Sequence, residues 1–146
     1  MLSADGSSNA VFLPIKPVYA ERIMRCQKRY EYRKVAFALP VSWIVVYASA
    51  PVKRIVGIVE ITDVRTGAPT SVWESTKKAA GVPRSTFRSY FSGRHRAVAI
   101  TLGRVLRLSR HVAPEDIDPR FSVPQSFRYV DGSFVRKALE LACSED

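Results

Sequence analysis

The chain has 146 residues, a length typical of one domain. Apolar residues make up 47% and charged residues 25%, a composition that excludes a largely disordered chain. Two cysteines, Cys26 and Cys143, exclude a disulfide-rich scaffold and a cysteine-based zinc site, and they suit a reducing compartment. Lysine and arginine number 23 against 13 acidic residues, which gives a formal net charge of +10.

No segment is apolar over the roughly 20 residues that a membrane span requires, because Ser42, Ser49 and Pro51 interrupt the longest apolar stretch. Residues 1–10 contain neither a basic start nor an apolar block, so no secretion signal is visible. We therefore expect a cytoplasmic protein without a membrane partner, with a flexible tail over residues 1–10.

Apolar patterning and proline positions in the first half of the chain predict strands separated by one short helix. The strands are expected over 10–15, 28–35, 42–49 and 55–64, with Gly57 as a bulge, and the helix runs from Pro17 to Met24. A period of two in the 28–35 strand places Lys28, Tyr30, Tyr32 and Lys34 on one face.

Turn signals in the second half predict a helical insertion over 70–93, followed by more strands. One helix over 72–80 is capped by Thr70 or Ser71 and ended by Gly81, and a second opens at Pro83 and reaches Phe91. A strand over 97–108 with a break at Gly103, a polar turn over 114–119, a short strand near 130 and a C-terminal helix within 131–146 follow. These elements describe an α+β domain with five or six strands.

A block of positive charge lies in the second half of the chain. From Ser75 to Pro114 the sequence contains nine basic residues and no acidic residue. They are Lys77, Lys78, Arg84, Arg88, Arg94, Arg96, Arg104, Arg107 and Arg110. Such a block attracts polyanions, of which nucleic acid is the commonest. The alternative is a basic surface that only keeps the protein in solution.

The stretch from Lys28 to Arg33 gathers charged and aromatic residues on a predicted strand. Glu31 would share its face with Arg29 and Arg33, whose charges would keep the carboxylate ionised. A carboxylate beside a guanidinium can read the polar edge of a base. The alternative is an exposed row of ion pairs without a ligand.

Residues 26–33 (Cys-Gln-Lys-Arg-Tyr-Glu-Tyr-Arg) resemble the Gly-x-Lys-x-x-Glu-x-Arg motif of the ASCH domain family, with Cys26 in place of the glycine. The segments 14–17, 47–57 and 124–129 also resemble that family, so the resemblance covers about residues 11–130. The last of these segments is similar to a subgroup described as predicted transcriptional regulators with a PUA-like domain.

The resemblance implies a PUA-like mixed β-barrel with flanking helices and a cleft that binds RNA or a modified base. It places Lys28, Glu31 and Arg33 in the cleft with Lys16 and the 125–127 loop nearby, which requires the strand to begin after Lys28. The full set of candidate ligand-binding residues is Lys16, Lys28, Glu31, Tyr32, Arg33, Ser49, Arg54, Arg84, Arg88, Arg94, Arg96, Gln125, Ser126 and Phe127. Among the aromatic residues, Tyr32 and Phe127 are the candidates for exposed stacking on a base.

Two alternatives to an RNA-binding or single-stranded nucleic-acid-binding module remain open. Some small relatives are amidohydrolases that act on acylated cytidine nucleosides with a lysine, a threonine and a glutamate. Lys28 matches the lysine, Glu31 stands at the threonine position, and the region of the distant glutamate reads Lys-Lys-Ala-Ala over 77–80. An enzyme of this chain would therefore be an amidohydrolase or a nuclease with Lys28 and Glu31 as its catalytic residues.

The second alternative is a duplex-DNA-binding regulator, because residues 77–91 resemble a helix-turn-helix. Gly81 would supply the turn, and Phe87, Tyr90 and Phe91 would pack inward. Arg84, Ser85, Arg88 and Ser89 would then face outward as in a recognition helix. A packed lid with a basic outer face is the other interpretation of this segment. Neither a metal nor a cofactor is expected, since His95 and His111 lie among arginines and no phosphate loop occurs.

Overall fold

The computed structural model describes residues 8–143, which form one six-stranded sheet with helices at both ends. The strands are β1 (Ser8–Ile15), β2 (Tyr30–Arg33), β3 (Trp43–Ala48), β4 (Arg54–Gly67), β5 (Ala97–Val112) and β6 (Arg128–Asp131). Their order across the sheet is β2-β5-β4-β3-β1-β6. β1 and β3 run parallel, and the other neighbouring pairs are antiparallel.

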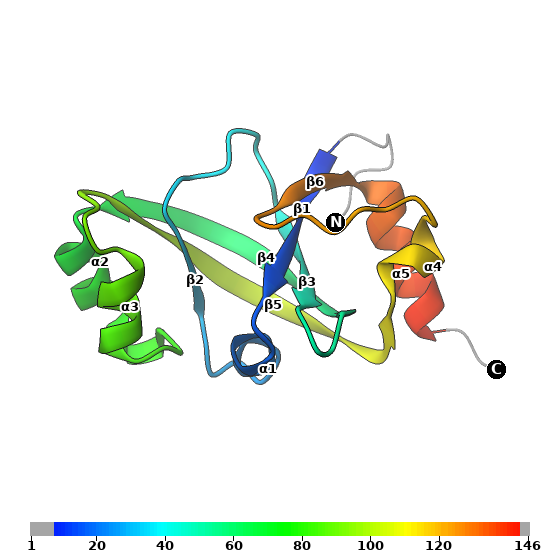
Figure 1. Ribbon diagram of the computed structural model, residues 1–146, viewed down its shortest axis with the longest axis horizontal. Coiled ribbons are helices and arrows are strands. Elements are labelled where there is room, and N and C mark those ends of the chain that lie inside the picture. The colour runs from blue at the N-terminus through cyan, green and yellow to red at the C-terminus, as the bar shows by residue number, and fades with distance from the viewer. Residues whose placement is uncertain (1–7, 144–146) are drawn as a thin grey trace.

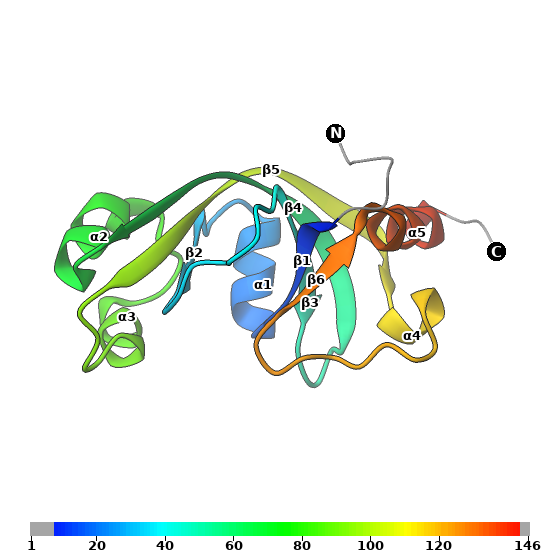
Figure 2. The ribbon, with the colours of Figure 1, turned by 90° about the horizontal axis from the view of Figure 1, so that it is seen from above.

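The sheet is mixed and strand-rich as predicted, but it is not a closed barrel. β2 and β6 are the two ends of the sheet, and these two described strands do not pair with each other. β4 and β5 form a long curved ribbon that spans the molecule (Figure 2). The predicted break at Gly103 is absent, because β5 continues to Val112 and takes up the irregularity as shifts in its register with β4.

The helices gather at opposite ends of the sheet (Figure 1). At one end lie α2 (Pro69–Thr76), the 3-10 turn η1 (Lys77–Ala79) and α3 (Arg84–Tyr90). At the other end lie α4 (Pro114–Ile117) and α5 (Gly132–Cys143), and α1 (Pro17–Met24) packs between them against β3, β4 and β5. The predicted Thr70 or Ser71 cap is wrong, because α2 begins earlier with Ala68 as its N-cap residue and no side-chain cap.

Alternating side chains of the central strands fill two cores, one on each face of the sheet. Phe12 of β1 packs in the cluster that includes Val135 of α5, whereas Val11 and Leu13 pack in the cluster that includes Ile23 of α1. This alternation follows from the period of two along a strand. A third, aromatic cluster joins β2 and β5 to α2 and α3.

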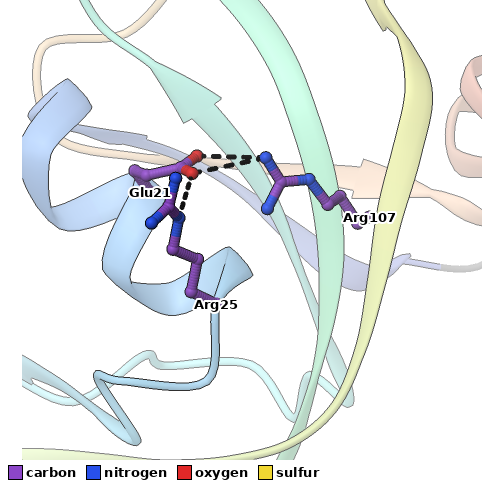
Figure 3. A network of polar contacts seen from close by, with 3 residues as sticks. All are labelled: Glu21, Arg25 and Arg107. Atoms are coloured by element: carbon purple, nitrogen blue, oxygen red, sulfur yellow. Dashed lines mark hydrogen bonds and ion pairs between the residues drawn. The ribbon is translucent and has the colours of Figure 1, made fainter.

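α1 is held to the sheet by close packing and by a surface ion cluster. The register between β4 and β5 shifts at the predicted bulge, Gly57, where Met24 of α1 occupies the space that a side chain would take. The Glu21 carboxylate accepts a hydrogen bond of 2.6 Å from Arg25 and lies 3.3 Å from the Arg107 guanidinium of β5 (Figure 3). These contacts fix the end of α1 from which the chain continues to Lys28.

The chain ends differ in part from the sequence expectations. β1 begins at Ser8, so residues 8–10 of the expected tail belong to the sheet, and residues 1–7 lie outside the described residues. The predicted polar turn over 114–119 contains α4, and the C-terminal helix is present as α5. Within residues 8–143, no helix has both the length and the apolar character needed to cross a membrane.

Candidate functional site

A pocket of about 210 Å³ lies where β1, α1, β2 and α3 meet, and we call it the Lys28 pocket. Its lining combines two buried or half-buried ionisable groups with aromatic and apolar walls. The lining residues are Pro14, Ile15, Lys16, Tyr19, Lys28, Glu31, Tyr32, Val82, Thr86, Phe87 and Tyr90. Drug-sized ligand sites typically measure roughly 300–1,000 Å³, so this pocket suits a smaller group.

Lys28 enters the pocket because the chain turns sharply after α1. Cys26 has a φ of 60°, a left-handed conformation that glycine adopts most easily, which explains why the resembling motif has glycine there. β2 begins only at Tyr30, so the alternation of side chains along the strand does not apply to Lys28. Lys28 and Glu31 can therefore line the same pocket, as the resemblance required. Lys28 is 2% exposed, and its ammonium group donates a 3.0 Å hydrogen bond to the Ala80 carbonyl.

The environment of Lys28 is largely aromatic. Its Nζ atom lies 4.9 Å from the ring centre of Tyr32 and 5.8 Å from that of Tyr19. Burial lowers the pKa of Lys28 below its usual value, the Glu31 carboxylate opposes this shift, and Arg22 reinforces it. A buried ammonium with a depressed pKa is typical of functional lysines.

Glu31 is the second ionisable group of the pocket, and its surroundings differ from those predicted. Its side chain is 12% exposed, and its carboxylate lies 4.0 Å from the Arg33 guanidinium. Burial raises the pKa of Glu31, and the charges of Lys28 and Arg33 only partly oppose that shift. Arg29 does not flank Glu31 as expected, because its guanidinium donates to the carbonyls of Leu102 and Gly103.

We expect the raised pKa of Glu31 to appear in the pH dependence of stability. Because the folded state holds this proton more tightly, the group stabilises the fold fully below its unfolded pKa of about 4.5. That contribution is lost as the pH rises through the folded pKa. The Glu31→Gln variant should therefore gain stability relative to wild type as the pH rises above about 4.5.

Denaturant unfolding of both proteins at several pH values between about 4 and 8 measures this difference. The two curves should keep a constant separation below the unfolded pKa and diverge above it. A constant separation over the whole range would show that the Glu31 pKa is not raised in the folded protein.

Arg33 and the 125–127 loop meet, as the resemblance implied. Arg33 Nη2 donates a 2.7 Å hydrogen bond to Ser126 Oγ. Gln125 is exposed beside them, whereas the Phe127 ring packs edge-on against Phe37 and is half-buried. This loop therefore lies on the Glu31 and Arg33 side of β2.

Three other predicted positions are less accessible than expected or lie outside the lining of the Lys28 pocket. Tyr32 is not an exposed stacking residue: it is buried, its hydroxyl shares a 2.7 Å hydrogen bond with Thr76, and its ring meets Phe87 edge-on. Ser49 follows β3 and its backbone N–H donates to Ile15, which places it near the exposed Lys16. Arg54 is exposed at the start of β4 and does not line the Lys28 pocket.

Three of the predicted arginines line a second pocket rather than the first. Arg84, Arg88 and Arg94 surround a space of about 370 Å³ together with Trp73, Phe87 and Phe91, and we call it the Trp73 pocket. Arg96 is exposed after α3. The C-terminal helix α5 packs on the far half of β5, at the opposite end of the molecule, and leaves these arginines uncovered (Figure 1).

The predicted helix-turn-helix differs from the observed segment. Gly81 has the expected positive φ of 72°, and Phe87 and Phe91 pack inward. The first element, however, is the three-residue turn η1 in line with α2, and Tyr90 is partly exposed on the rim of the Lys28 pocket. Arg84, Ser85, Arg88 and Ser89 are exposed as predicted. This arrangement fits a packed lid with a basic outer face.

Several residues that line the Lys28 pocket were not among the predicted site residues. Tyr19 comes from α1, just before the motif, whereas Val82, Thr86 and Tyr90 come from the segment around α3, far from the motif in sequence. Periodicity within each element marks Val82 and Tyr90 as apolar positions but gives no sign of which pocket they line. Among residues 8–143, no cluster of three or more histidine, cysteine or acidic side chains is placed to hold a metal ion.

The fold and pocket define a small α+β domain in which one sheet edge, one helix and a helical insertion enclose a lysine–glutamate pair. Residues 13–105 match the ASCH domain, and the chain belongs to that family. It is 26% identical over 133 residues to a protein of Zymomonas mobilis named ASCH domain-containing ribonuclease, covering 86% of each chain.

Solved structures share the fold. The crystal structure of ASCH from Zymomonas mobilis has a TM-score of 0.83 at 24% identity, covering 91% of this chain and 95% of that one. The N-terminal domain of Staphylothermus marinus McrB has a TM-score of 0.58 at 12% identity, covering 97% and 98%. Human THYN1 in complex with 5-methylcytosine containing DNA has a TM-score of 0.53 at 10% identity, covering 96% and 100%.

Proposed function

We propose that this protein binds single-stranded RNA and holds one unstacked nucleotide in the Lys28 pocket. The observation that carries the proposal is the convergence of Lys28, Glu31 and aromatic walls in a pocket of about 210 Å³. Sequence-specific RNA recognition uses bases that are splayed out of a strand, stacked on aromatic rings and hydrogen-bonded along their edges. The net charge of +10 supports a polyanionic partner.

The polar groups of the pocket suggest which base is held. A carboxyl group keeps an accepting oxygen whether or not it is ionised, so Glu31 can accept a hydrogen bond from an exocyclic amino group. Arg33 does not itself line the pocket, but it lies 4.0 Å from Glu31, is fixed by Ser126 and presents donors for a carbonyl or phosphate oxygen beside it. Cytosine carries an amino group and a carbonyl on one edge, whereas uracil carries no amino group. The pocket should therefore prefer cytosine to uracil.

Titration of labelled tetracytidylate and tetrauridylate, followed by fluorescence anisotropy at low and physiological salt, tests the proposal. We expect salt-sensitive binding that favours tetracytidylate. Arg33→Ala should weaken binding about tenfold, since a hydrogen bond from a charged group typically contributes roughly 1.5–3 kcal/mol. Glu31→Ala, which removes the accepting oxygen, should lose the preference between the two RNAs more than it loses affinity.

Arg136→Ala is the matched control, because this exposed arginine lies on α5 at the opposite end of the molecule (Figure 1). It removes the same charge and should change binding little. Equal weakening by Arg33→Ala and Arg136→Ala would show non-specific attraction and would overturn the proposal. Binding of duplex DNA that requires Arg84 and Arg88 but not Glu31 would instead identify a duplex-DNA-binding regulator.

The pocket also favours a second candidate function, cleavage of the bound RNA. Burial moves the pKa of Lys28 down and that of Glu31 up, which brings both groups toward the range in which side chains exchange protons near neutral pH. A relative 26% identical to this chain is named a ribonuclease. In this function, Lys28 and Glu31 would act as a base and an acid on one phosphodiester.

Gel analysis of a labelled oligoribonucleotide distinguishes cleavage from binding. If the protein is a nuclease, products should accumulate with wild type and disappear with Lys28→Met, while the variant still binds RNA. An intact RNA after prolonged incubation with wild-type protein that binds it would leave the binding function alone. Release of an acyl group from an acylated cytidine, lost in Lys28→Met, would identify an amidohydrolase instead.

A further inference from the structure

We infer that the Trp73 pocket is a second nucleotide subsite, so that one RNA strand crosses α3 and occupies both pockets. This inference rests on the proposed RNA-binding function and extends the footprint beyond the Lys28 pocket. It assigns Trp73 as the stacking residue and Arg84 and Arg88 as phosphate contacts.

The two pockets lie on two faces of the same short helix. Arg84, Arg88 and Phe91 line the Trp73 pocket and are spaced by four and three residues, so they share one face of α3. Thr86 and Tyr90 line the Lys28 pocket and are spaced by four residues on the adjacent face. The Phe87 side chain lines both pockets. The two pockets are therefore neighbours that are separated only by α3.

The chemistry of the Trp73 pocket fits a nucleotide. Trp73 is half-buried, and its ring is held against Phe87 with the ring centres 4.9 Å apart. A tryptophan fixed on one side and open on the other provides a stacking platform for a base of any sequence. With about 370 Å³, the pocket has more room than the Lys28 pocket, as a site without base selection would need.

The charges in the Trp73 pocket are positioned for a polyanion. Arg88 and Arg94 are exposed and form no ion pair among the described residues. The acidic residue of the pocket, Glu74, is paired with Lys77 at 2.7 Å, and the charge of Arg84 also lowers the pKa of Glu74, so Arg84 is the arginine of this pocket that interacts with a carboxylate. Proteins that bind single-stranded nucleic acid combine basic side chains, which contact the phosphate backbone, with aromatic side chains on which the bases stack. Arg88 and Arg94 beside Trp73 provide this combination.

Tryptophan fluorescence provides a direct test, because the chain has two tryptophans and Trp43 is 7% exposed inside the core. Titration with tetracytidylate should quench the Trp73 emission, whereas cytidine monophosphate, which fills only the Lys28 pocket, should quench it little. Trp73→Leu should lose the quenching and weaken tetracytidylate binding about tenfold. The same variant should bind cytidine monophosphate as wild type does.

Arg88→Ala and Arg104→Ala separate a phosphate contact from general charge. Both residues are exposed and belong to the acid-free basic block, but only Arg88 lines the Trp73 pocket. Arg88→Ala should reduce the slope of log affinity against log salt by about one unit, and Arg104→Ala should not. Equal slopes for the two variants would argue against the subsite.

The outcomes separate this inference from the proposed function. If tetracytidylate binds in a Glu31-dependent manner but Trp73→Leu and Arg88→Ala bind as wild type, the second subsite is wrong and the first pocket stands. If neither RNA nor cytidine monophosphate binding depends on Glu31, the proposed function fails. Equal quenching by a polyglutamate peptide of the same charge would identify a site for acidic peptides and overturn the inference.

Discussion

Replacing Phe87 with alanine is expected to lower the free energy of unfolding by about 3–5 kcal/mol, the range for removing a buried aromatic side chain. Phe87 is 3% exposed, and its ring centre lies 4.9 Å from those of Tyr32 and Trp73 and 4.7 Å from that of Phe91. Without this ring, α3 loses its main contact with β2 and α2. Denaturant unfolding measures the loss, and RNA binding should fall with it because both pockets share this wall.

Two variants control for the substitution itself. Phe87→Leu keeps an apolar side chain in the cluster and should cost only about 1–1.5 kcal/mol. Ser89→Ala changes an exposed position of the same helix and should leave stability nearly unchanged. A loss below about 1 kcal/mol for Phe87→Ala would show that the aromatic cluster does not hold α3 in place.

The motif from Cys26 to Arg33 could be predicted from the sequence because its geometry is local. The short strand and the shared face of Glu31 and Arg33 depend on backbone conformations of adjacent residues. Those features required only the spacing of the motif. The resemblance predicts that Lys28 lies beside Glu31, provided that the strand begins after Lys28, and the observed strand does so.

The remaining walls of the pocket could not be predicted, because they depend on contacts between distant parts of the chain. The hydrogen bond from Lys28 to Ala80, for example, joins residues 52 positions apart. Hydrophobic periodicity marks a residue as buried without identifying its neighbours. Tyr32 illustrates this limit: its burial arises from α2 and α3, which cover the face that strand alternation alone leaves open.

The predicted surroundings of the Glu31 carboxylate are wrong in part for a related reason. Sequence proximity suggested that Arg29 and Arg33 would stabilise the carboxylate, but electrostatic shifts depend on burial and on the real orientation of each guanidinium. Arg29 donates instead to two backbone carbonyls in the middle of β5, and the effect of burial on the Glu31 pKa then outweighs the attraction of Lys28 and Arg33. The prediction of a closed barrel is wrong for a similar reason, because closure depends on pairing between β2 and β6, which are distant in the sequence and lie at opposite ends of the sheet.

Gly81 connects the helical insertion to the candidate site more directly than any other glycine. It has a φ of 72°, and a Cβ atom added there would lie 2.3 Å from Cβ and 2.9 Å from the Cα of Lys28. The Gly81 carbonyl also accepts a 2.8 Å hydrogen bond from Arg22 of α1. The Lys28 backbone therefore passes directly over this glycine, and the side chain reaches the Ala80 carbonyl just before it.

We expect Gly81→Ala to destabilise the protein by about 2–5 kcal/mol and to weaken RNA binding about tenfold or more. The positive φ costs roughly 1–2 kcal/mol for a residue with a side chain, and the contact with the Lys28 backbone adds an overpacking cost of about 1–3 kcal/mol. Because a backbone atom cannot move as a flexible side chain does, Lys28 must shift away from Glu31. Denaturant unfolding and anisotropy titration with tetracytidylate measure the two effects.

Gly93→Ala is a matched control for this prediction. Gly93 has a nearly identical φ of 75°, but a Cβ atom there would meet no atom within 4 Å. Its substitution should therefore cost only the conformational contribution of roughly 1–2 kcal/mol and leave the affinity for tetracytidylate unchanged. The difference between the two variants isolates the contact with Lys28. Equal stability losses and equal affinities would mean that the position of Lys28 does not depend on the close approach of Gly81, and that the pocket is held by other contacts.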